Sequence, residues 1–345
     1  MLSPDELDGL WRLERPYLNT ASYGLPPQPA FEALQLALGE WRDGRTSWEG
    51  WTESVGRARA SFARLVGVRP QDVAAGATVS ELVGLVAASL PEGAYVLVPE
   101  VEFTSNLFPW LAQEPRGVHV RTAPLPGLAD AVDASTTLVA VSAVQSSNGE
   151  LADLASIGEA AAANDALVLV DATQACGWLP LQAADADFVV AHTYKWLMSP
   201  RGAALMAVRP ERLGELVPVH AGWWAAENPL GDYYGPPLRL ADTARRLDTS
   251  PAWFSWVGAA SALELVDQIG VERIHEHNIG LANRFRAGMG LEAGDSAIVS
   301  IAVADGAEQL ERAGIRAAVR AGGLRVSFHL YNTAEHVDAA VAALR

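Results

Sequence analysis

The sequence predicts an α/β fold, in which a mainly parallel sheet forms a large domain and a smaller α+β domain follows it. Three observations predict this fold. Short apolar runs rich in β-branched residues recur through the first two-thirds of the 345-residue chain, and helical stretches alternate with them. Continuous runs of this kind are typical of strands buried on both faces of a parallel sheet. After about residue 240, the order changes to two long helical stretches followed by shorter strands and helices.

The expected elements follow in chain order. Strands are predicted at 94–99 (AYVLVP), 137–144 (TLVAVSAV), 166–171 (ALVLVD) and 187–192 (DFVVAH), with a crossover helix at 152–165. In the last third we expect helices at 255–270 and 271–289, strands at 297–303 and 324–331 with a helix between them, and a terminal helix at 334–345. We therefore divide the chain into an N-terminal segment (1–16) that packs with the small domain, a large domain (17–245) and a small domain (246–345).

Composition and charge restrict the function. The net charge of −16 argues against nucleic acid and anionic membranes as partners. No apolar run approaches the roughly 20 residues of a membrane span, and the first residues do not resemble a signal peptide. Cys176 is the only cysteine, which excludes an intrachain disulfide and fits a reducing cytoplasm. No cysteine cluster or HExxH motif predicts a metal site.

The chain contains one lysine, Lys195, in the stretch AHTYKWLMSPRG. A composition that favours arginine explains why lysine is rare in this chain. The simplest interpretation of Lys195 is a surface lysine without a special role. However, Lys195 follows an apolar strand directly and lies between Tyr194 and Trp196. Burial there would lower its pKa, so that the amine could attack a carbonyl, whereas a guanidinium would stay charged.

Other candidates also lie at the ends of predicted strands, where open α/β sheets bind ligands. Thr78 and Glu81 form a T-x-x-E capping box, and a helix start of this kind can bind a phosphate, although helix capping alone would explain it. Asp171 ends a buried strand and needs a partner, either as a helix N-cap or for a protonated ring nitrogen. Gln174 could contact a ring hydroxyl. Together with Lys195, these are the groups that pyridoxal phosphate requires.

Over nearly its whole length, the sequence resembles the class V aminotransferase family of fold-type I pyridoxal-phosphate enzymes. This family includes aminotransferases, isopenicillin N epimerase, kynureninase and cysteine desulfurases. Five stretches carry the resemblance: YLNTASYGLPP (17–27), GATVSELVG (76–84), VDATQACG (170–177), TYKWLMSPRG (193–202) and LRVSFHLYNTAEHVD (324–338).

The resemblance implies roles for particular residues. Lys195 would bond the cofactor and later move the α-proton of the substrate, within an external aldimine. The other implied cofactor contacts are Asp171 at the ring nitrogen, Gln174 at the ring hydroxyl, Phe103 on the ring face, Ser146 from the variable stretch 145–148, and Thr78, Val79, His192 and Tyr194 at the phosphate. Ser250 falls near where a neighbouring subunit reaches the phosphate, so a homodimer with shared sites is implied. Arg325 and Asn19 would bind the substrate. Alternation along the strand places Arg325 opposite Leu324 and Val326, as a pocket residue requires.

Two differences from the cysteine desulfurases argue against that activity for this chain. Cysteine desulfurases use a mobile cysteine in the small domain and a histidine on the cofactor ring, whereas this chain has only Cys176 and places Phe103 at the ring. We therefore expect a pyridoxal-phosphate enzyme for an amino-acid-like metabolite, most simply an aminotransferase. A β-eliminating C–S lyase or an epimerase is the alternative, followed by a non-catalytic ligand-binding descendant of the fold.

Overall fold

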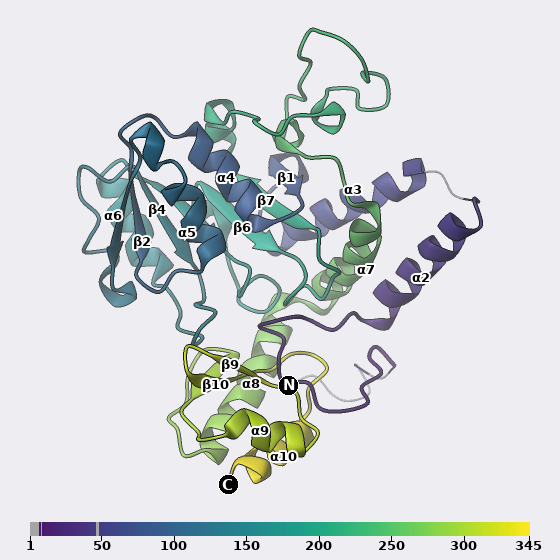
Figure 1. The fold of residues 1–345 in the computed structure, drawn as a ribbon, viewed down its shortest axis with the longest axis vertical. Coiled ribbons are helices and arrows are strands. Elements are labelled where there is room, and N and C mark those ends of the chain that lie inside the picture. The colour runs from purple at the N-terminus through teal and green to yellow at the C-terminus, as the bar shows by residue number, and fades with distance from the viewer. Residues whose placement is uncertain (1–6, 8, 46–47) are drawn as a thin grey trace.

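The computed structural model describes residues 7, 9–45 and 48–345. They form a large domain around a seven-stranded sheet, and a smaller domain that lies below it in Figure 1. Within the described residues, the α-helices with assigned bounds are α2 (Gln28–Arg42), α3 (Trp48–Leu65), α4 (Val79–Ser89), α5 (Thr104–Leu111), α6 (Leu154–Ala163), α7 (Trp253–Ile269), α8 (Val271–Gly288), α9 (Gly306–Arg312) and α10 (Ala334–Leu344).

The large sheet has the strand order β1-β7-β6-β5-β4-β2-β3. Its strands are β1 (Val73–Gly76), β2 (Tyr95–Pro99), β3 (His119–Ala123), β4 (Leu138–Ser142), β5 (Leu167–Asp171), β6 (Phe188–His192) and β7 (Ala204–Val208). The strands are parallel except β7, which is antiparallel to both of its neighbours. The predicted α/β class with a mainly parallel sheet is therefore confirmed. All four strands predicted in this part of the chain are present.

Helices cover both faces of the large sheet, because successive side chains of a strand point to opposite faces. On β2, Val96 and Val98 pack with α4 and α5, whereas Leu97 packs with the cluster that contains residues of α3, α6 and α7. The strands β4, β6 and β7 are buried at every position, as expected for strands that are covered on both faces. The result is a three-layer arrangement with the sheet in the middle (Figure 1).

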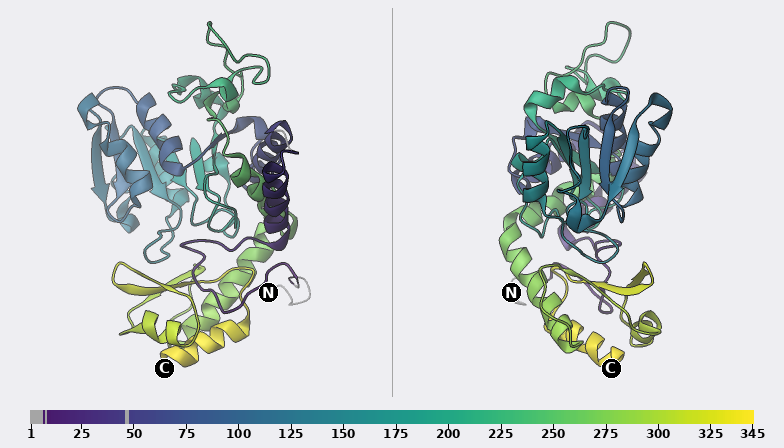
Figure 2. Two further views of the ribbon diagram at one scale, coloured as in Figure 1. Left: turned by 45° about the vertical axis from the view of Figure 1, so that its right-hand side comes forward. Right: turned by 90° about the vertical axis from the view of Figure 1, so that its left-hand side faces the viewer.

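The small domain contains an antiparallel sheet of β8 (Ile298–Ile301), β10 (Gly323–Ser327) and β9 (Ala318–Arg320), in that spatial order. Its core joins side chains of α8, α9, α10 and this sheet. The helix α7 packs along α2 and α3, and α8 continues from it towards the small domain (Figure 2). The predicted residue boundaries of the domains stay predictions.

The stretch 18–24, which follows the N-terminal segment, contacts residues on both sides of the domain boundary. Leu18 donates its amide to the Arg316 carbonyl (2.7 Å) and accepts from the Ser327 amide (3.0 Å), both in the small domain. A few residues later, the Gly24 amide donates to the Tyr194 carbonyl of the large domain (2.9 Å). Residues 1–6 and 8 of the predicted 1–16 segment lie outside the described residues. Within the part of the chain that the structure describes, no helix is long and apolar enough to cross a membrane.

Candidate active site

A cavity of about 210 Å³ opens at the edge where the parallel strands of the large sheet end. It has a floor of strand ends and a rim of loops, as expected for ligand sites in open α/β sheets. Its lining contains every predicted cofactor-binding residue except Ser250. The lining residues are Thr78, Val79, Ser80, Phe103, Ser105, Ser142, Ser146, Asp171, Thr173, Gln174, His192, Tyr194, Lys195 and Arg201.

One end of the cavity is the N-terminus of α4. Thr78 is the N-cap: its hydroxyl accepts from the Glu81 amide (3.2 Å), and the Glu81 carboxylate accepts from the Ala77 amide (2.8 Å). This reciprocal pair fixes the loop and leaves the amides of Val79 and Ser80 without a preceding carbonyl to bond. Free amides and the helix dipole favour an anion at this position.

Lys195 lines the cavity and is only 6% exposed. Its Nζ lies 5.3 Å from the centre of the Phe103 ring and 5.7 Å from that of Tyr194. Burial, together with Arg325, Arg201 and Arg320, lowers its pKa to about 8, against an opposing effect of Asp171. A substantial fraction of this amine is therefore neutral, and so nucleophilic, near pH 8.

Asp171 ends β5 at the floor of the cavity and is 4% exposed. Its Oδ1 accepts from the Thr173 amide (2.8 Å). Burial raises the pKa of this carboxyl, whereas the Thr173 hydrogen bond and the Lys195 charge lower it. A buried carboxylate of this kind is stabilised by a cationic N–H partner.

Gln174 lies one turn further on and is already oriented by two contacts. Its Nε2 donates to the Ala21 carbonyl (2.9 Å), and its Oε1 accepts from Trp196 Nε1 (2.8 Å). An amide nitrogen carries two hydrogens, so one donor of Gln174 remains for a ligand.

His192 and Tyr194 flank the path from β6 to Lys195. Their rings meet edge to face, with centres 4.4 Å apart. Burial, with Arg201 and Lys195 nearby, lowers the pKa of His192 to about 4, so this imidazole is neutral at physiological pH. Neither of its ring nitrogens has a hydrogen-bond partner among the described residues. The Arg201 guanidinium lies over the Tyr194 ring, 4.5 Å from its centre.

Phe103 stands at the mouth of the cavity, at the start of α5, and its side chain is 45% exposed. The residue before it, Glu102, is buried and fixes this turn. The Glu102 carboxylate accepts from the amides of Phe103 (2.9 Å) and Ser142 (2.8 Å), and it also pairs with the Ser142 hydroxyl. Burial raises the pKa of Glu102. These contacts fix the backbone at the start of α5, from which the Phe103 ring reaches towards Lys195.

Arg325 lies on β10 of the small domain and is 2% exposed; it is not among the residues that line the cavity, but it contacts one of them, Ser146. Leu324 and Val326 point into the small-domain core, so Arg325 points away from it, as the strand alternation predicts. Its guanidinium donates to the Ser146 carbonyl and to the Ser22 hydroxyl (2.7 Å). Asn19 pairs with Ser327 of the same strand and is 9% exposed, but it does not line the cavity.

Ser250 lies apart from the main cavity. Its hydroxyl accepts from Trp223 Nε1 (3.0 Å), and it lines a smaller hollow beside Gly76 and Ala77. Within this chain, the structure therefore does not bring Ser250 together with Lys195.

Sequence reasoning missed five lining residues. Three of them, Ser80, Thr173 and Arg201, lie inside quoted motifs, so their places in the motifs were available signals. Ser142 pairs with Asp171 across β4 and β5, which only the strand register reveals. Ser105 lies in the first turn of α5.

The chain was compared with known proteins. The sequence model described as Aminotransferase class-V matches residues 42–294. The chain is 29% identical to an uncharacterized aminotransferase, YcbU, from Bacillus subtilis, with 94% of this chain and 92% of the relative covered. It is 28% identical to isopenicillin N epimerase from Amycolatopsis lactamdurans, with 95% and 94% covered.

Among solved structures, a mutant of C-DES with glycine covalently linked to its PLP cofactor has a TM-score of 0.88 at 20% identity. The similarity covers 100% of this chain and 99% of that chain. C-DES is described as a cystine C–S lyase. The three similar proteins are thus named for three different reactions: transamination, epimerisation and C–S cleavage. At 20% identity, the match to C-DES shows a shared fold and does not identify the reaction.

Proposed function

Because the chain belongs to the class V aminotransferase family, we propose that it is a pyridoxal-phosphate enzyme that transaminates an amino acid or an amino-acid-like metabolite. Its fold is that of the fold-type I pyridoxal-phosphate enzymes. One observation carries the proposal: the only lysine of the chain is buried in a cavity between a helix N-terminus and a buried carboxylate.

The cavity residues fit pyridoxal phosphate. The Val79 and Ser80 amides and the Thr78, Ser80 and Tyr194 hydroxyls would hold the phosphate, with the unpartnered His192 ring beside them. Asp171 would hold the ring nitrogen, Gln174 the ring hydroxyl and Phe103 the ring face. Ser146 lines the remaining side. This set combines an anion site, a carboxylate and an amine in one cavity, as the cofactor requires.

The bound cofactor supplies a carbonyl group for the amine and an electron sink for the bond that breaks at the α-carbon. Lys195 contributes an amine that is partly neutral near pH 8, and it would take and return the α-proton. Asp171 would keep the ring nitrogen protonated through its negative charge. Phe103 would exclude water from one face, but it has no group that can carry a proton.

Arg325 would orient the substrate through its α-carboxylate. Its guanidinium is buried, and its two hydrogen-bond partners, the Ser146 carbonyl and the Ser22 hydroxyl, are both neutral. A buried cation without an anionic partner is costly, and a planar carboxylate would offset that cost with charge-assisted hydrogen bonds. Asn19 would help to position the strand of Arg325, because its backbone pairs with Ser327 two residues further along β10.

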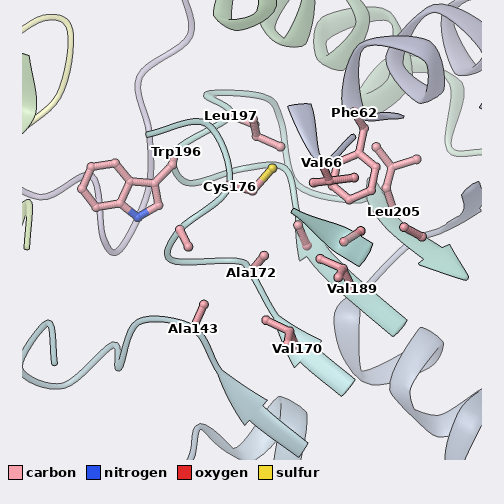
Figure 3. Close-up of a cluster of buried hydrophobic side chains, with 14 of the residues drawn as sticks. Phe62, Val66, Ala143, Val170, Ala172, Cys176, Val189, Trp196, Leu197 and Leu205 are labelled. Carbon is pink, nitrogen blue, oxygen red and sulfur yellow. The ribbon is translucent and has the colours of Figure 1, made fainter. Parts of the chain in front are cut away.

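The proposal of transamination rests on the family and on the named aminotransferase among the relatives. Persulfide chemistry at Cys176 is disfavoured. This thiol is 3% exposed, lies within the apolar cluster shown in Figure 3, and has a pKa that burial raises to about 12. A reactive cysteine needs an accessible thiolate. β-Elimination without a cysteine nucleophile and epimerisation are the alternatives.

An amino-acid panel tests the reaction type. Holoenzyme is incubated with single amino acids in the absence of a 2-oxo acid, and its absorption spectrum and products are followed. Accumulation of the pyridoxamine form, with a stoichiometric 2-oxo acid, supports transamination. Pyruvate and ammonia released without the pyridoxamine form would replace transamination with β-elimination. Racemised substrate without either product would indicate epimerisation.

We also propose a cytoplasmic homodimer with shared active sites. Ser250 lies beside the Gly76–Ala77 loop, close to the proposed phosphate position but outside the cavity. Large apolar side chains are exposed on the large domain, among them Trp41 (62%) and Tyr234 (91%). Exposed apolar groups of this kind favour an interface, and the single buried cysteine fits a reducing compartment.

A further inference from the structure

The β9–β10 hairpin of the small domain places two arginines on one face. In its register Arg320 is opposite Gly323, and Arg325 is opposite Ala318. Directly opposed residues of an antiparallel pair share a face, and so do residues two apart along a strand. Arg320, Gly323 and Arg325 therefore share a face, while Leu324 lies on the other face in the small-domain core. Since Gly323 has no side chain, no large group separates the two arginines.

The turn of the hairpin fixes this arrangement. Ala321 and Gly322, the two residues between the strands, have φ of 47° and 80°. Two successive left-handed residues are the mark of the tight hairpin turn that matches the twist of its strands. Arg320 is the last residue before the turn, so it lies at the tip of the hairpin. There it is exposed, whereas Arg325 is buried.

The guanidiniums of Arg320 and Arg325 both donate to the hydroxyl group of Ser22. Ser22 Oγ accepts from Arg325 Nη2 (2.7 Å) and from Arg320 Nη2 (3.2 Å). The structure shows no carboxylate within ion-pair distance of either arginine in residues 7, 9–45 and 48–345. The buried Nε of Arg325 has no hydrogen-bond partner in the same residues. Two like charges therefore meet at a neutral group, in a chain whose net charge is −16.

The two charges act on each other and on the cavity. Burial and the neighbouring Arg320 lower the pKa of Arg325 to about 10. Arg320 also acts on Lys195, whose pKa it lowers together with Arg325 and Arg201. Arg320 is therefore part of the electrostatic environment of the active site, although it does not line the cavity itself. Repulsion within such a pair is relieved by bound negative charge.

The α-carboxylate of a substrate carries one negative charge, so it can neutralise only one of these two arginines. Resting on the proposed function, we infer that Arg320 binds a second carboxylate, so that the preferred substrates are amino acids with an acidic side chain and the matching dicarboxylic 2-oxo acids. Arg325 holds the α-carboxylate in the buried position, and Arg320 meets the side-chain carboxylate at the exposed tip of the hairpin. Arg320 is then a specificity residue that acts on the substrate directly.

Ligand binding to the holoenzyme tests this inference without turnover. Succinate and butyrate have the same number of carbons but two and one carboxylates, and their dissociation constants are measured by calorimetry. A charge-assisted contact predicts that succinate binds about tenfold or more tightly than butyrate. Arg320→Gln should reduce this ratio to about twofold or less, mainly by weakening succinate binding, while Arg320→Lys should restore part of it. Arg325→Gln should weaken both ligands.

The matched control is Arg312→Gln, an exposed arginine on α9 whose guanidinium bonds the Glu308 carbonyl. It should leave both dissociation constants unchanged. Equal binding of succinate and butyrate by the wild type would overturn the inference and indicate that both arginines share one carboxylate. An unchanged ratio in Arg320→Gln would overturn it as well, because the second carboxylate would then be bound by another group. The visible absorption of the cofactor is recorded on the same samples. If that absorption is missing, the proposed function fails as well, whereas normal absorption with no succinate preference removes only the role of Arg320.

Discussion

Lys195 is a buried amine in an unusually cationic setting, and this determines its chemistry at the residue scale. Its ordinary pKa of about 10.4 would leave almost no neutral amine at physiological pH. Burial is the largest cause of its shift, and three arginines add to it, while Asp171 opposes it. The same arginines would attract anionic groups of cofactor and substrate, so one set of charges serves both binding and activation of the amine.

The titration of Lys195 can be observed alone, because no other lysine is present. Apoprotein labelled with [ε-¹³C]lysine should give one lysine Cε resonance whose midpoint lies near pH 8. Asp171→Asn removes the one neighbouring charge that favours the protonated amine, so it should move the midpoint lower. A midpoint above pH 10 in the folded apoprotein would contradict the account of this residue.

The lowered pKa of Lys195 also makes the free energy of unfolding depend on pH. Between about pH 8 and the unfolded value near 10.4, the unfolded chain binds a proton at Lys195 that the folded chain has released. The free energy of unfolding of the apoprotein should therefore rise with pH across this window, relative to Lys195→Met. Urea unfolding of both proteins at pH 7.5, 9 and 10 measures the difference. A wild-type curve that runs parallel to that of the variant would argue against the shift.

At the scale of elements, the loop that carries Lys195 depends on the close approach of Gly24. A Cβ on Gly24 would lie 1.9 Å from the Lys195 carbonyl oxygen and 3.1 Å from the Met198 Cα, both backbone atoms. Gly24→Ala should therefore displace this loop and lower both the unfolding free energy and the affinity for pyridoxal phosphate. Gly56→Ala is the control, since Gly56 is exposed on α3 and a Cβ there meets nothing within 4 Å. In a helix this change should stabilise by about 0.5–1 kcal/mol.

His329 connects the strand of Arg325 to the loop of Lys195. Its Nε2 lies 2.9 Å from the Trp196 carbonyl, and its Nδ1 lies 3.3 Å from Asn278 Nδ2. Burial lowers the pKa of His329 to about 3, so the ring is neutral and can donate from Nε2 while accepting at Nδ1.

His329→Leu should leave the Trp196 carbonyl unpaired and cost about 1–3 kcal/mol of unfolding free energy. The visible band of the holoenzyme should shift as well, because the neighbouring lysine loses its fixed position. His329→Gln keeps a donor that can reach this carbonyl, so it should recover part of both effects. Equal stability and identical spectra for the three proteins would exclude a positioning role for His329.

The predicted elements show which sequence signals carry structural information. The strand runs at 94–99, 137–144, 166–171 and 187–192 correspond to β2, β4, β5 and β6, because continuous apolar runs identify strands that are buried on both faces. The strand β3 lies at the sheet edge, and its sequence HVRTA has no such run. The pairing of Arg320 with Gly323 depends on strand register, which the sequence pattern alone did not provide.

At the scale of the whole molecule, the proposed active site combines residues of both domains. The large domain provides Lys195 and Asp171, and the small domain provides Arg325. Ser22 contacts Arg325, and Gly24 contacts the Tyr194 carbonyl beside Lys195, so the stretch 18–24 joins the two parts. The motif resemblance assigned most residues that line the cavity. It also placed Ser250 near a neighbouring subunit, and within its own chain Ser250 lies outside the cavity.

The proposed homodimer predicts that assembly and cofactor retention are linked. Sedimentation velocity should give a species of twice the chain mass at micromolar concentration. If Ser250 completes the phosphate site of the neighbouring subunit, dilution to monomers should release pyridoxal phosphate. A monomer that keeps its cofactor at all concentrations would refute the sharing of active sites, while leaving the site within each chain intact.

Borohydride reduction of the holoenzyme, followed by peptide mass spectrometry, tests directly whether Lys195 bonds the cofactor. The visible absorption band should disappear on reduction, and one phosphopyridoxyl group should be fixed to the peptide that contains Lys195. Lys195→Ala should show neither the band nor the modified peptide, and Lys195→Arg should have no turnover, because a guanidinium keeps its proton. A protein that takes up no pyridoxal phosphate, or a Lys195→Arg variant that retains catalysis, would contradict the account.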